Sequence, residues 1–512
     1  MRSINLRSLS IQIALALAAS CTAVASQAAQ VDAVLRTEAA RSGSADTLIV
    51  LQAKAPKSLL RTDGNYLERR RALVDMLRAT ADVTQADLRR WLDAEGVAYR
   101  PFWITNSIQA RLTAAQIEAL AARDDVEAIA SNATIALHLP DAETQAAQPL
   151  PMAPSAIEWG VNKIKAPQVW AQGINGAGVV VAGQDTGIRW THNAIKAKYR
   201  GWDAGTQVAD HNYNWHDAIH AANGSCAADS PTPCDDNGHG SHTVGTMLGD
   251  DGTTNQVGVA PGAKWIGCRN MNAGAGTPAT YNECAQWFLA PTDLTGANPD
   301  PDKAPDVIGN SWGCPPSEGC TAIAGTEVRA AIENLISGGI VFVAAAGNDG
   351  SACSTIGDAP GTLDNVFTIG STTSTDTISG FSGRGPVAAG AGTGTVNKPD
   401  VVAPGSSVRS ITRSSDTAYS TLSGTSMATP HVAGAVALLM QANPGLKGNP
   451  AAVADILRST AVPLTSSTQV CGGIPATTFP NPVQGYGQID MVAAIARASD
   501  NLFSDDFDAP AR

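Results

Sequence analysis

The sequence has few charged residues, and they do not form a basic surface. Asp, Glu, Lys and Arg make up 16% of the 512 residues, and the formal net charge is −12. The chain lacks a basic stripe, which argues against nucleic acid and anionic membranes as partners. Beyond the N-terminal segment it also lacks an uninterrupted apolar run of about 18 residues, the minimum for a membrane span. We therefore expect a soluble monomer with neither partner once that segment is removed.

Metal-binding patterns are also scarce. The cysteines do not form a paired C-x-x-C arrangement, which argues against a structural zinc site. HDAIH at 216–220 resembles the H-E-x-x-H helix of zinc proteases, but Asp replaces Glu, and Gly224 soon interrupts the segment. A zinc hydrolase therefore stays an alternative hypothesis, and the metal ligands are unknown.

Residues 1–28 have the features of a secretory signal peptide. Arg2 and Arg7 give a positive start, and residues 11–19 form an apolar stretch too short to span a bilayer. Small residues follow in AVASQAA, which predicts cleavage after Ala25 or Ala28. We expect the protein to be secreted and extracellular.

The cysteine content fits this compartment. Of the 9 cysteines, Cys21 lies in LAASC, a weak lipoprotein-like pattern within the predicted signal; excluding it leaves 9 − 1 = 8. An even number in an exported chain predicts disulfides, whose pairing the sequence leaves open. Short spacings favour Cys226–Cys234 and Cys314–Cys320.

The length predicts more than one folded part. Residues 29–140 alternate strand, helix, strand, helix, strand, which is typical of a small α+β unit of the ferredoxin-like, split-βαβ kind. Thr113 and Gln116 predict a capping box at the start of its last helix. The Ala-, Pro- and Gln-rich residues 141–156 predict an exposed linker, where proteolytic cleavage concentrates.

Residues 157–495 have a different pattern of apolar residues. Near-continuous apolar runs alternate there with helix-like stretches, at 177–184, 306–312, 338–347 and 365–372. Such runs predict an α/β fold with a doubly wound, mostly parallel sheet flanked by helices on both faces. Active residues of this architecture lie at the carboxyl ends of strands. Residues 496–512 are acidic and predict a C-terminal tail.

Three separated segments place a polar residue in a glycine-rich setting. Asp185 closes an apolar run, His239 lies between two glycines, and Ser426 precedes the helix-like HVAGAVALLMQ. Proline is tolerated in the first turn of a helix, so Pro430 predicts that Ser426 lies at or just before the helix N-terminus. Free backbone N–H groups there stabilise negative charge.

Each residue also has an ordinary interpretation of its own. Asp185 could bond nearby amides, His239 could be a loop residue, and Ser426 could be an N-cap. The combination favours chemistry, because a serine hydroxyl needs an adjacent base, and that base needs an orienting carboxylate.

The blocks QDTGI, NGHGSHTVGT and SGTSMATPHVAG resemble the three signature blocks of the subtilisin-like serine proteases (subtilases, peptidase S8), in the same order. The resemblance implies that Asp185 orients the base, His239 is general base and then acid, and Ser426 is the nucleophile that forms an acyl-enzyme. IVFVAAAGNDG resembles the segment that ends in the oxyanion-hole asparagine, which implies that role for Asn348.

The resemblance also implies substrate contacts. GNSWG resembles the strand that pairs with the peptide, the residues before Asn348 resemble the opposite pocket wall, and CSTIGDAPG resembles the pocket floor. The implied residues are Ser311, Trp312, Gly313, Ala344, Ala345, Ala346, Gly347 and Gly357. Their small size implies a roomy pocket and broad, mainly apolar specificity.

By the same resemblance, residues 29–140 are a propeptide that assists folding and acts as an intramolecular inhibitor, with the maturation site in 141–156. The chemistry requires no cofactor, but many subtilases bind structural calcium. Candidate ligands without EF-hand spacing are Asp229, Asp235, Asp236, Asp250, Asp251, Asp300 and Asp302.

The leading hypothesis is thus a secreted serine endopeptidase, made as an autoprocessed proenzyme and acting on proteins or peptides. Its base must be neutral, so activity should favour neutral to alkaline pH. A protease-like scaffold without turnover is the alternative from another class.

Overall fold

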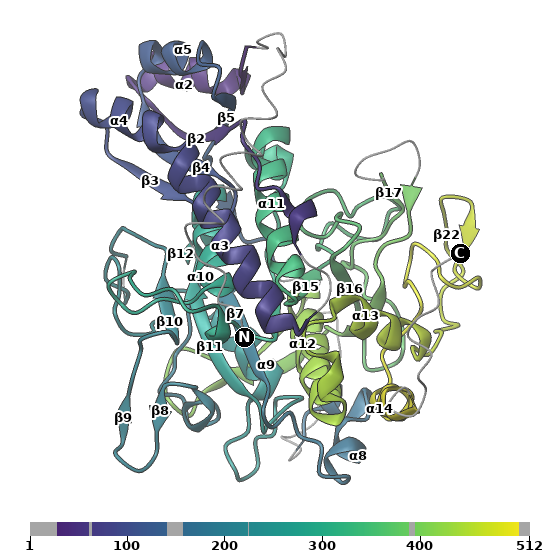
Figure 1. Ribbon diagram of the computed structural model, residues 1–512. Coiled ribbons are helices and arrows are strands. Elements are labelled where there is room, and N and C mark those ends of the chain that lie inside the picture. Colours follow the sequence, from purple (N-terminus) through teal and green to yellow (C-terminus); the bar gives the residue numbers. More distant parts are fainter. Residues whose placement is uncertain (1–27, 61–63, 141–156, 224, 389–394, 501–512) are drawn as a thin grey trace.

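The computed structural model describes residues 28–500 except 61–63, 141–156, 224 and 389–394. The predicted linker, all but the last residue of the predicted signal peptide, and residues 501–512 lie outside this range. The chain forms an N-terminal unit (residues 28–140), which lies against a larger main unit (residues 157–500) (Figure 1).

The N-terminal unit is a five-stranded sheet with three of its four helices packed on one side. Its strands are β1 (Gln30–Val31), β2 (Ala45–Leu51), β3 (Tyr99–Phe102), β4 (Ser107–Leu112) and β5 (Val126–Ser131), in the order β1-β5-β2-β4-β3. Its helices are α2 (Ala33–Ser42), α3 (Tyr66–Thr84), α4 (Ala86–Ala94) and α5 (Ala114–Ala121). The antiparallel order β5-β2-β4-β3 is that of a split-βαβ unit. The predicted capping box is present at Thr113 and Gln116.

Helix α3 extends from the N-terminal unit along the main unit (Figure 1). The buried Arg70 side chain donates from Nε to the carbonyl of Gly338 at 2.7 Å. Helices α3 and α4 separate at Gln85, whose buried Nε2 donates to the carbonyl of Phe102 at 3.1 Å. A buried amide thus ties the break between the two helices to the sheet.

The main unit contains a seven-stranded parallel sheet, which confirms the predicted doubly wound α/β fold. Its order is β10-β11-β7-β14-β15-β16-β19. The strands are β10 (Trp215–Asp217), β11 (Lys264–Arg269), β7 (Val180–Asp185), β14 (Val307–Asn310), β15 (Val341–Ala345), β16 (Phe367–Thr372) and β19 (Val401–Pro404). All four β14 residues are buried, as expected of a strand covered on both faces.

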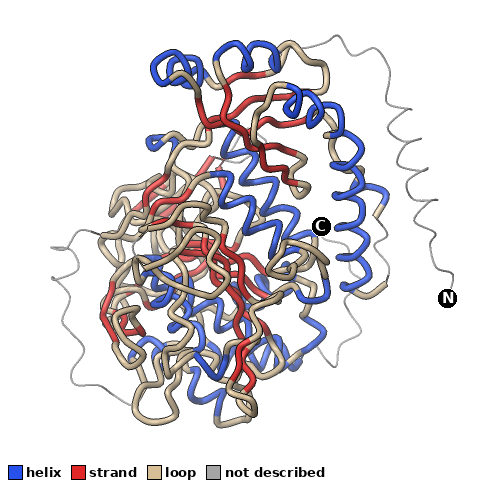
Figure 2. Tube along the Cα trace, turned by 90° about the vertical axis from the view of Figure 1, so that its left-hand side faces the viewer, coloured by secondary structure: helices blue, strands red, loops and turns tan. Residues whose placement is uncertain are grey.

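Helices cover both faces of this sheet (Figure 2). One face packs against α8 (Ala166–Trp170), α9 (His239–Leu248), α12 (Thr425–Ala442) and α14 (Met491–Asp500), and the other against α10 (Pro278–Leu289) and α11 (Ala322–Ser337). The remaining helices are α7 (Trp159–Lys163) and α13 (Pro450–Ser459). The remaining strands are β6 (Ile135–Ala136), β8 (Trp202–Asp203), β9 (Val208–Ala209), β12 (Met271–Asn272), β13 (Ala275–Gly276), β17 (Val387–Ala388), β18 (Thr395–Val396), β20 (Val408–Ile411), β21 (Tyr419–Leu422), β22 (Val470–Cys471) and β23 (Ile474–Pro475).

The predicted tail boundary at residue 496 falls inside a helix. Helix α14 continues to Asp500, and Ala498 is fully buried in the core of the main unit. The acidic character of the last residues hid this apolar face. No helix among the described residues is long and apolar enough to cross a membrane.

The two units share an apolar core on the α10–α11 side. Leu73, Phe102 and Ile104 of the N-terminal unit belong to the same buried cluster as Phe288 and Leu335 of the main unit. The sheet of the N-terminal unit therefore covers helices α10 and α11, whose outer face would otherwise expose apolar side chains.

Disulfides join the cysteines of the described residues in four pairs. Cys226–Cys234 and Cys314–Cys320 confirm the pairs favoured by spacing. Cys268–Cys284 links β11 to α10, and Cys353–Cys471 joins residues 118 apart in sequence.

Loss of Cys353–Cys471 should destabilise the protein most. A loop of this length predicts a cost of about 4–5 kcal/mol on replacing both cysteines by serine, against about 2–3 kcal/mol for the short Cys226–Cys234 loop. Thermal unfolding of the two double variants measures the difference. Equal losses would contradict the loop-length argument.

Candidate active site

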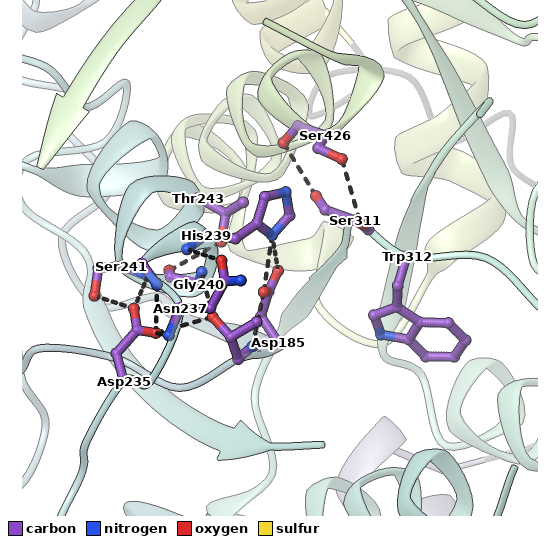
Figure 3. Close-up of polar contacts among 12 residues, drawn as sticks. Asp185, Asp235, Asn237, His239, Gly240, Ser241, Thr243, Ser311, Trp312 and Ser426 are labelled. Atoms are coloured by element: carbon purple, nitrogen blue, oxygen red, sulfur yellow. Dashed lines mark hydrogen bonds and ion pairs between the residues drawn. The ribbon is translucent and has the colours of Figure 1, made fainter. Parts of the chain in front are cut away.

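The three residues predicted to carry chemistry lie together at the carboxyl edge of the main sheet (Figure 3). Asp185 is the last residue of β7, His239 the first residue of α9, and Ser426 the second residue of α12. All three are buried. Chain segments far apart in sequence thus converge where a doubly wound sheet places its active residues.

Asp185 and His239 form a tight pair. Both carboxylate oxygens of Asp185 lie 2.8 Å from His239 Nδ1, which donates to them. This contact fixes the proton on Nδ1 and leaves Nε2 as the acceptor of a neutral ring. Nε2 is buried and has no hydrogen-bond partner among the described residues. Asp185 also accepts from the Thr186 backbone N–H at 2.7 Å, so it bonds an amide as well as the histidine.

A second buried carboxylate shapes the turn that presents His239. Asp235 accepts from the backbone N–H groups of Asn237 (3.0 Å), Gly238 (2.7 Å) and Ser241 (3.0 Å). Burial raises the pKa of Asp235, while these bonds favour its ionised form. Its role in this turn was not evident from sequence, where it was a calcium candidate.

The glycine beside His239 is required by close approach. A Cβ on Gly240 would lie 2.2 Å from the carbonyl oxygen of Gly187 and 2.9 Å from Asp185 Cβ. A larger residue would push α9 away from β7 and separate His239 from its carboxylate.

Ser426 lies in the first turn of α12, as predicted, but Pro430 does not. Pro430 lies inside the helix and has no N–H for the carbonyl of Ser426, four residues earlier. Ser311 Oγ donates to this carbonyl instead, at 3.1 Å. Ser426 Oγ in turn donates to the Ser311 carbonyl at 3.2 Å. A neighbouring strand end thus compensates for the proline and anchors the nucleophile candidate.

Asn348 follows β15, and its side chain is oriented by Thr425. Its Oδ1 accepts from the N–H of Thr425 at 2.9 Å and from the Thr425 hydroxyl at 3.0 Å. This fixes the amide so that Nδ2 points into the cleft, where it donates to the carbonyl of His138 at 2.9 Å. The position of Thr425 directly before Ser426 was the available signal.

A cleft runs beside Ser426 and contains most of the predicted substrate residues. Ser311, Trp312, Gly313, Ala345, Ala346 and Gly347 line it, together with Asn348 and Ser426. The ring of Trp312 is stacked on Tyr281 with centroids 3.7 Å apart. The apolar walls are therefore held by packing behind them.

Two predicted pocket residues lie elsewhere. Ala344 is fully buried in the core cluster, because alternate residues of β15 point to opposite faces. Gly357 is exposed, and the next residue, Asp358, lines the cleft in its place. Asp358 accepts from the N–H of Cys314 at 2.8 Å, and burial raises its pKa to about 6.

The HDAIH segment does not form a zinc helix. His216 lies on strand β10, so the segment is not the helix that the zinc-protease motif requires. His216 and His220 each contact one oxygen of Glu283, at 2.9 and 3.0 Å. Asp217 pairs with the buried Arg269 at 3.1 Å.

The calcium candidates are scattered and already bonded. Asp236 pairs with Arg269, Asp302 with Arg71, and Asp229 with His220. The carboxylates of Asp235, Asp250, Asp251 and Asp300 accept backbone N–H groups of their own turns. Within the described residues, no three His, Cys, Asp or Glu side chains are grouped to hold a metal ion. These carboxylates therefore do not fit a calcium site as arranged.

The chain is similar in sequence to several known proteins. Bacillopeptidase F of Bacillus subtilis (strain 168) is 34% identical over 461 residues, 88% of this chain but only 30% of that protein. Subtilisin DY of Bacillus licheniformis is 34% identical over 314 residues, 61% of this chain and 93% of its own length. Alkaline elastase YaB of Bacillus sp. (strain YaB) is 29% identical over 352 residues, 69% of this chain and 75% of that protein. Residues 176–487 match the Peptidase S8 subtilase family. The chain therefore belongs to the subtilase family of serine endopeptidases.

Proposed function

We propose that this chain is a secreted serine endopeptidase that hydrolyses protein or peptide substrates and is made as a self-processing proenzyme. The observation that carries the proposal is the contact of His239 Nδ1 with both oxygens of Asp185, beside Ser426 at the start of a buried helix. Together these supply the orienter, the base and the nucleophile that acyl transfer needs.

In the proposed reaction, His239 Nε2 takes the proton of Ser426 Oγ as the oxygen attacks the scissile carbonyl. Oγ first turns away from the Ser311 carbonyl, to which it now donates. The imidazolium that forms is stabilised by Asp185 and then gives its proton to the leaving amine. Water repeats the sequence on the acyl-enzyme with His239 again as base.

Two donors would stabilise the oxyanion. Asn348 Nδ2 already donates to a carbonyl in the cleft, and the Ser426 N–H belongs to the first turn of α12, where N–H groups lack helical partners. The helix dipole adds to this stabilisation. The protein itself thus supplies the groups that the chemistry uses.

The N-terminal unit is proposed to be the propeptide and intramolecular inhibitor, with 1–28 as the signal that directs export. Strand β6, at the end of this unit, pairs antiparallel with β13 at the cleft. A substrate bound in this way is selected largely through its backbone, which predicts broad specificity along most of the peptide. The disulfides fit an oxidising, extracellular compartment.

Replacing the nucleophile should stop self-processing. Ser426→Ala should leave the precursor uncleaved, because it removes the hydroxyl proposed to attack the scissile carbonyl, and casein hydrolysis should fall by at least about 10⁴-fold. Electrophoresis of the purified chain and a casein assay measure both effects. A Ser426→Ala chain that still cleaves itself would refute the mechanism, and an inert wild type with an intact N-terminal unit would favour the scaffold alternative.

Thr425 should act through Asn348. Thr425→Val removes the hydroxyl that fixes the Asn348 amide and should lower kcat about tenfold with little change in KM, whereas Asn348→Ala should cost about 10²- to 10³-fold, as loss of this donor does in subtilisin. The double variant should be no slower than Asn348→Ala alone. Additive losses would show that Thr425 acts independently.

The binding of the N-terminal unit to the main unit should weaken as pH rises. Glu327 of α11 is buried under this unit, facing Lys54 and Glu127, and burial raises its pKa to about 7. Because the protonated form is favoured only while the units are in contact, this stabilisation is complete below the ordinary glutamate pKa and lost as pH passes 7.

The affinity of the cleaved N-terminal unit for the main unit should fall about 10- to 100-fold between pH 5 and pH 8. Size-exclusion chromatography of the cleaved, undissociated protein at each pH measures it without relying on catalysis. Glu327→Gln should flatten the dependence, and Glu333→Gln, on the same helix but half-exposed, should leave it unchanged.

A further inference from the structure

The segment at the end of the N-terminal unit lies in the cleft in an ordered way. Ile135 is paired with Gly276 and Ala136 with Ala275, in antiparallel register. The Leu137 N–H donates to the carbonyl of Gly274 at 2.7 Å. Residues 135–137 therefore extend β13 as an added strand that leads directly toward Ser426.

The next residue presents its carbonyl to the proposed oxyanion donor. Asn348 Nδ2 donates to the His138 carbonyl at 2.9 Å. Two residues later, Pro140 lies over the residue before α12, since a Cβ on Gly424 would be 3.6 Å from Pro140 Cδ. The chain thus crosses the nucleophile between His138 and Pro140. The carbonyl that occupies an oxyanion site belongs to the bond that is attacked, here His138–Leu139.

The His138 side chain contacts an acid of the main unit. Its Nε2 is paired with Oε1 of Glu318, whose other oxygen accepts the Ala136 N–H at 2.7 Å. Glu318 ends the short turn η4 (Pro316–Glu318), inside the loop closed by the Cys314–Cys320 disulfide. The Glu318 side chain is only 21% exposed, so its charge is poorly screened by water. One carboxylate thus contacts both the backbone N–H of Ala136 and the side chain of His138.

A second acid lines the same cleft. Asp358 stands against Gly313, where a Cβ would lie only 2.1 Å from Asp358 Oδ2. The absence of a side chain at position 313 is what admits this carboxylate to the cleft. His138 lines the cleft with it, and the wall residues Ala345 and Ala346 carry no charge to oppose the two acids.

We propose that His138–Leu139 is the bond by which the chain processes itself, and that Glu318, assisted by Asp358, makes the enzyme prefer a cationic residue or histidine before the scissile bond. The inference rests on the proposed function. For the residue before the scissile bond, it replaces the mainly apolar specificity expected from sequence with a preference for positive charge. Ser426 Oγ bonds to the His138 carbonyl carbon, the amine of Leu139 leaves with the proton held by His239, and water then frees the His138 carboxylate.

The processing bond is tested on the full chain. Intact mass measurement at the earliest cleavage should give a fragment that ends at His138 and a main unit that begins at Leu139. His138→Asp places a negative charge beside Glu318 and should slow processing by at least about tenfold, whereas His138→Arg should process at close to the wild-type rate. A first cut inside 141–156, or equal rates for the two variants, would overturn this assignment.

The preference is tested on the processed enzyme with peptides Ile-Ala-Leu-X-Leu-Pro, where X is Arg, His or Phe and the bond cleaved is X–Leu. At pH 8 the wild type should cleave the Arg peptide with kcat/KM at least about tenfold above that for Phe. Glu318→Gln should reduce this ratio by at least about fivefold through a lower kcat/KM for the Arg peptide, and a thermal unfolding transition like that of the wild type shows that the variant is folded. The control Asp455→Asn, an acid with 75% of its side chain exposed on α13, should change neither rate.

The outcomes separate this inference from the function on which it rests. Cleavage of the Phe peptide as fast as the Arg peptide, or a ratio unchanged in Glu318→Gln, would overturn the preference while the serine mechanism stands. A wild type inert toward all three peptides and casein would refute the proposed peptidase function and the inference with it.

Discussion

The buried pair of Asp185 and His239 is the constraint on which the active site depends. Both side chains are almost fully shielded from water, with 4% and 1% of their surfaces exposed. A carboxylate in such a place is costly unless each oxygen is bonded, and both oxygens reach Nδ1 while one also accepts from Thr186. This requirement explains the glycine at position 240, the only residue type that lets α9 approach β7 so closely.

The hydrogen bonds around this pair hold the neighbouring groups of the active site in place. Asp235 holds the turn before His239, the Ser311 hydroxyl compensates for the bond that Pro430 cannot make, and Thr425 holds the amide of Asn348. None of these groups is in a position to react. Each satisfies a buried polar atom whose displacement would move a reacting group, so stability and preorganisation are the same property here.

The N-terminal unit contacts the main unit in two ways, through a large apolar surface and through one short strand at the cleft. Its sheet covers the apolar outer face of α10 and α11, and its last strand extends β13 beside Ser426. The large apolar contact supplies the affinity, and the short strand supplies the position. Under the proposed function, a chain held in this way would keep its own segment in the cleft as both first substrate and inhibitor.

Sequence reasoning predicted three side chains that the structure brings together, and it did so where local pattern and chemistry coincide. Asp185, His239 and Ser426 each follow or begin an apolar element, and the parallel sheet brings strand ends to one edge. It failed where the outcome depends on which way a side chain faces. Ala344 belongs to the core because alternate residues of its strand face opposite sides. Asp358, not Gly357, lines the cleft. The apolar face of α14 continues beyond residue 496.

The sequence by itself determined the fold class, the three residues proposed to react and the two short disulfides, because these follow from periodicity, motif and spacing along the chain. Only the tertiary structure decided which groups meet across the cleft. Glu318, Asn348 and His138 are far apart in sequence, and no local pattern relates them. Their meeting depends on how two separately folded units dock, since contact between distant segments is set by packing rather than by neighbouring residues.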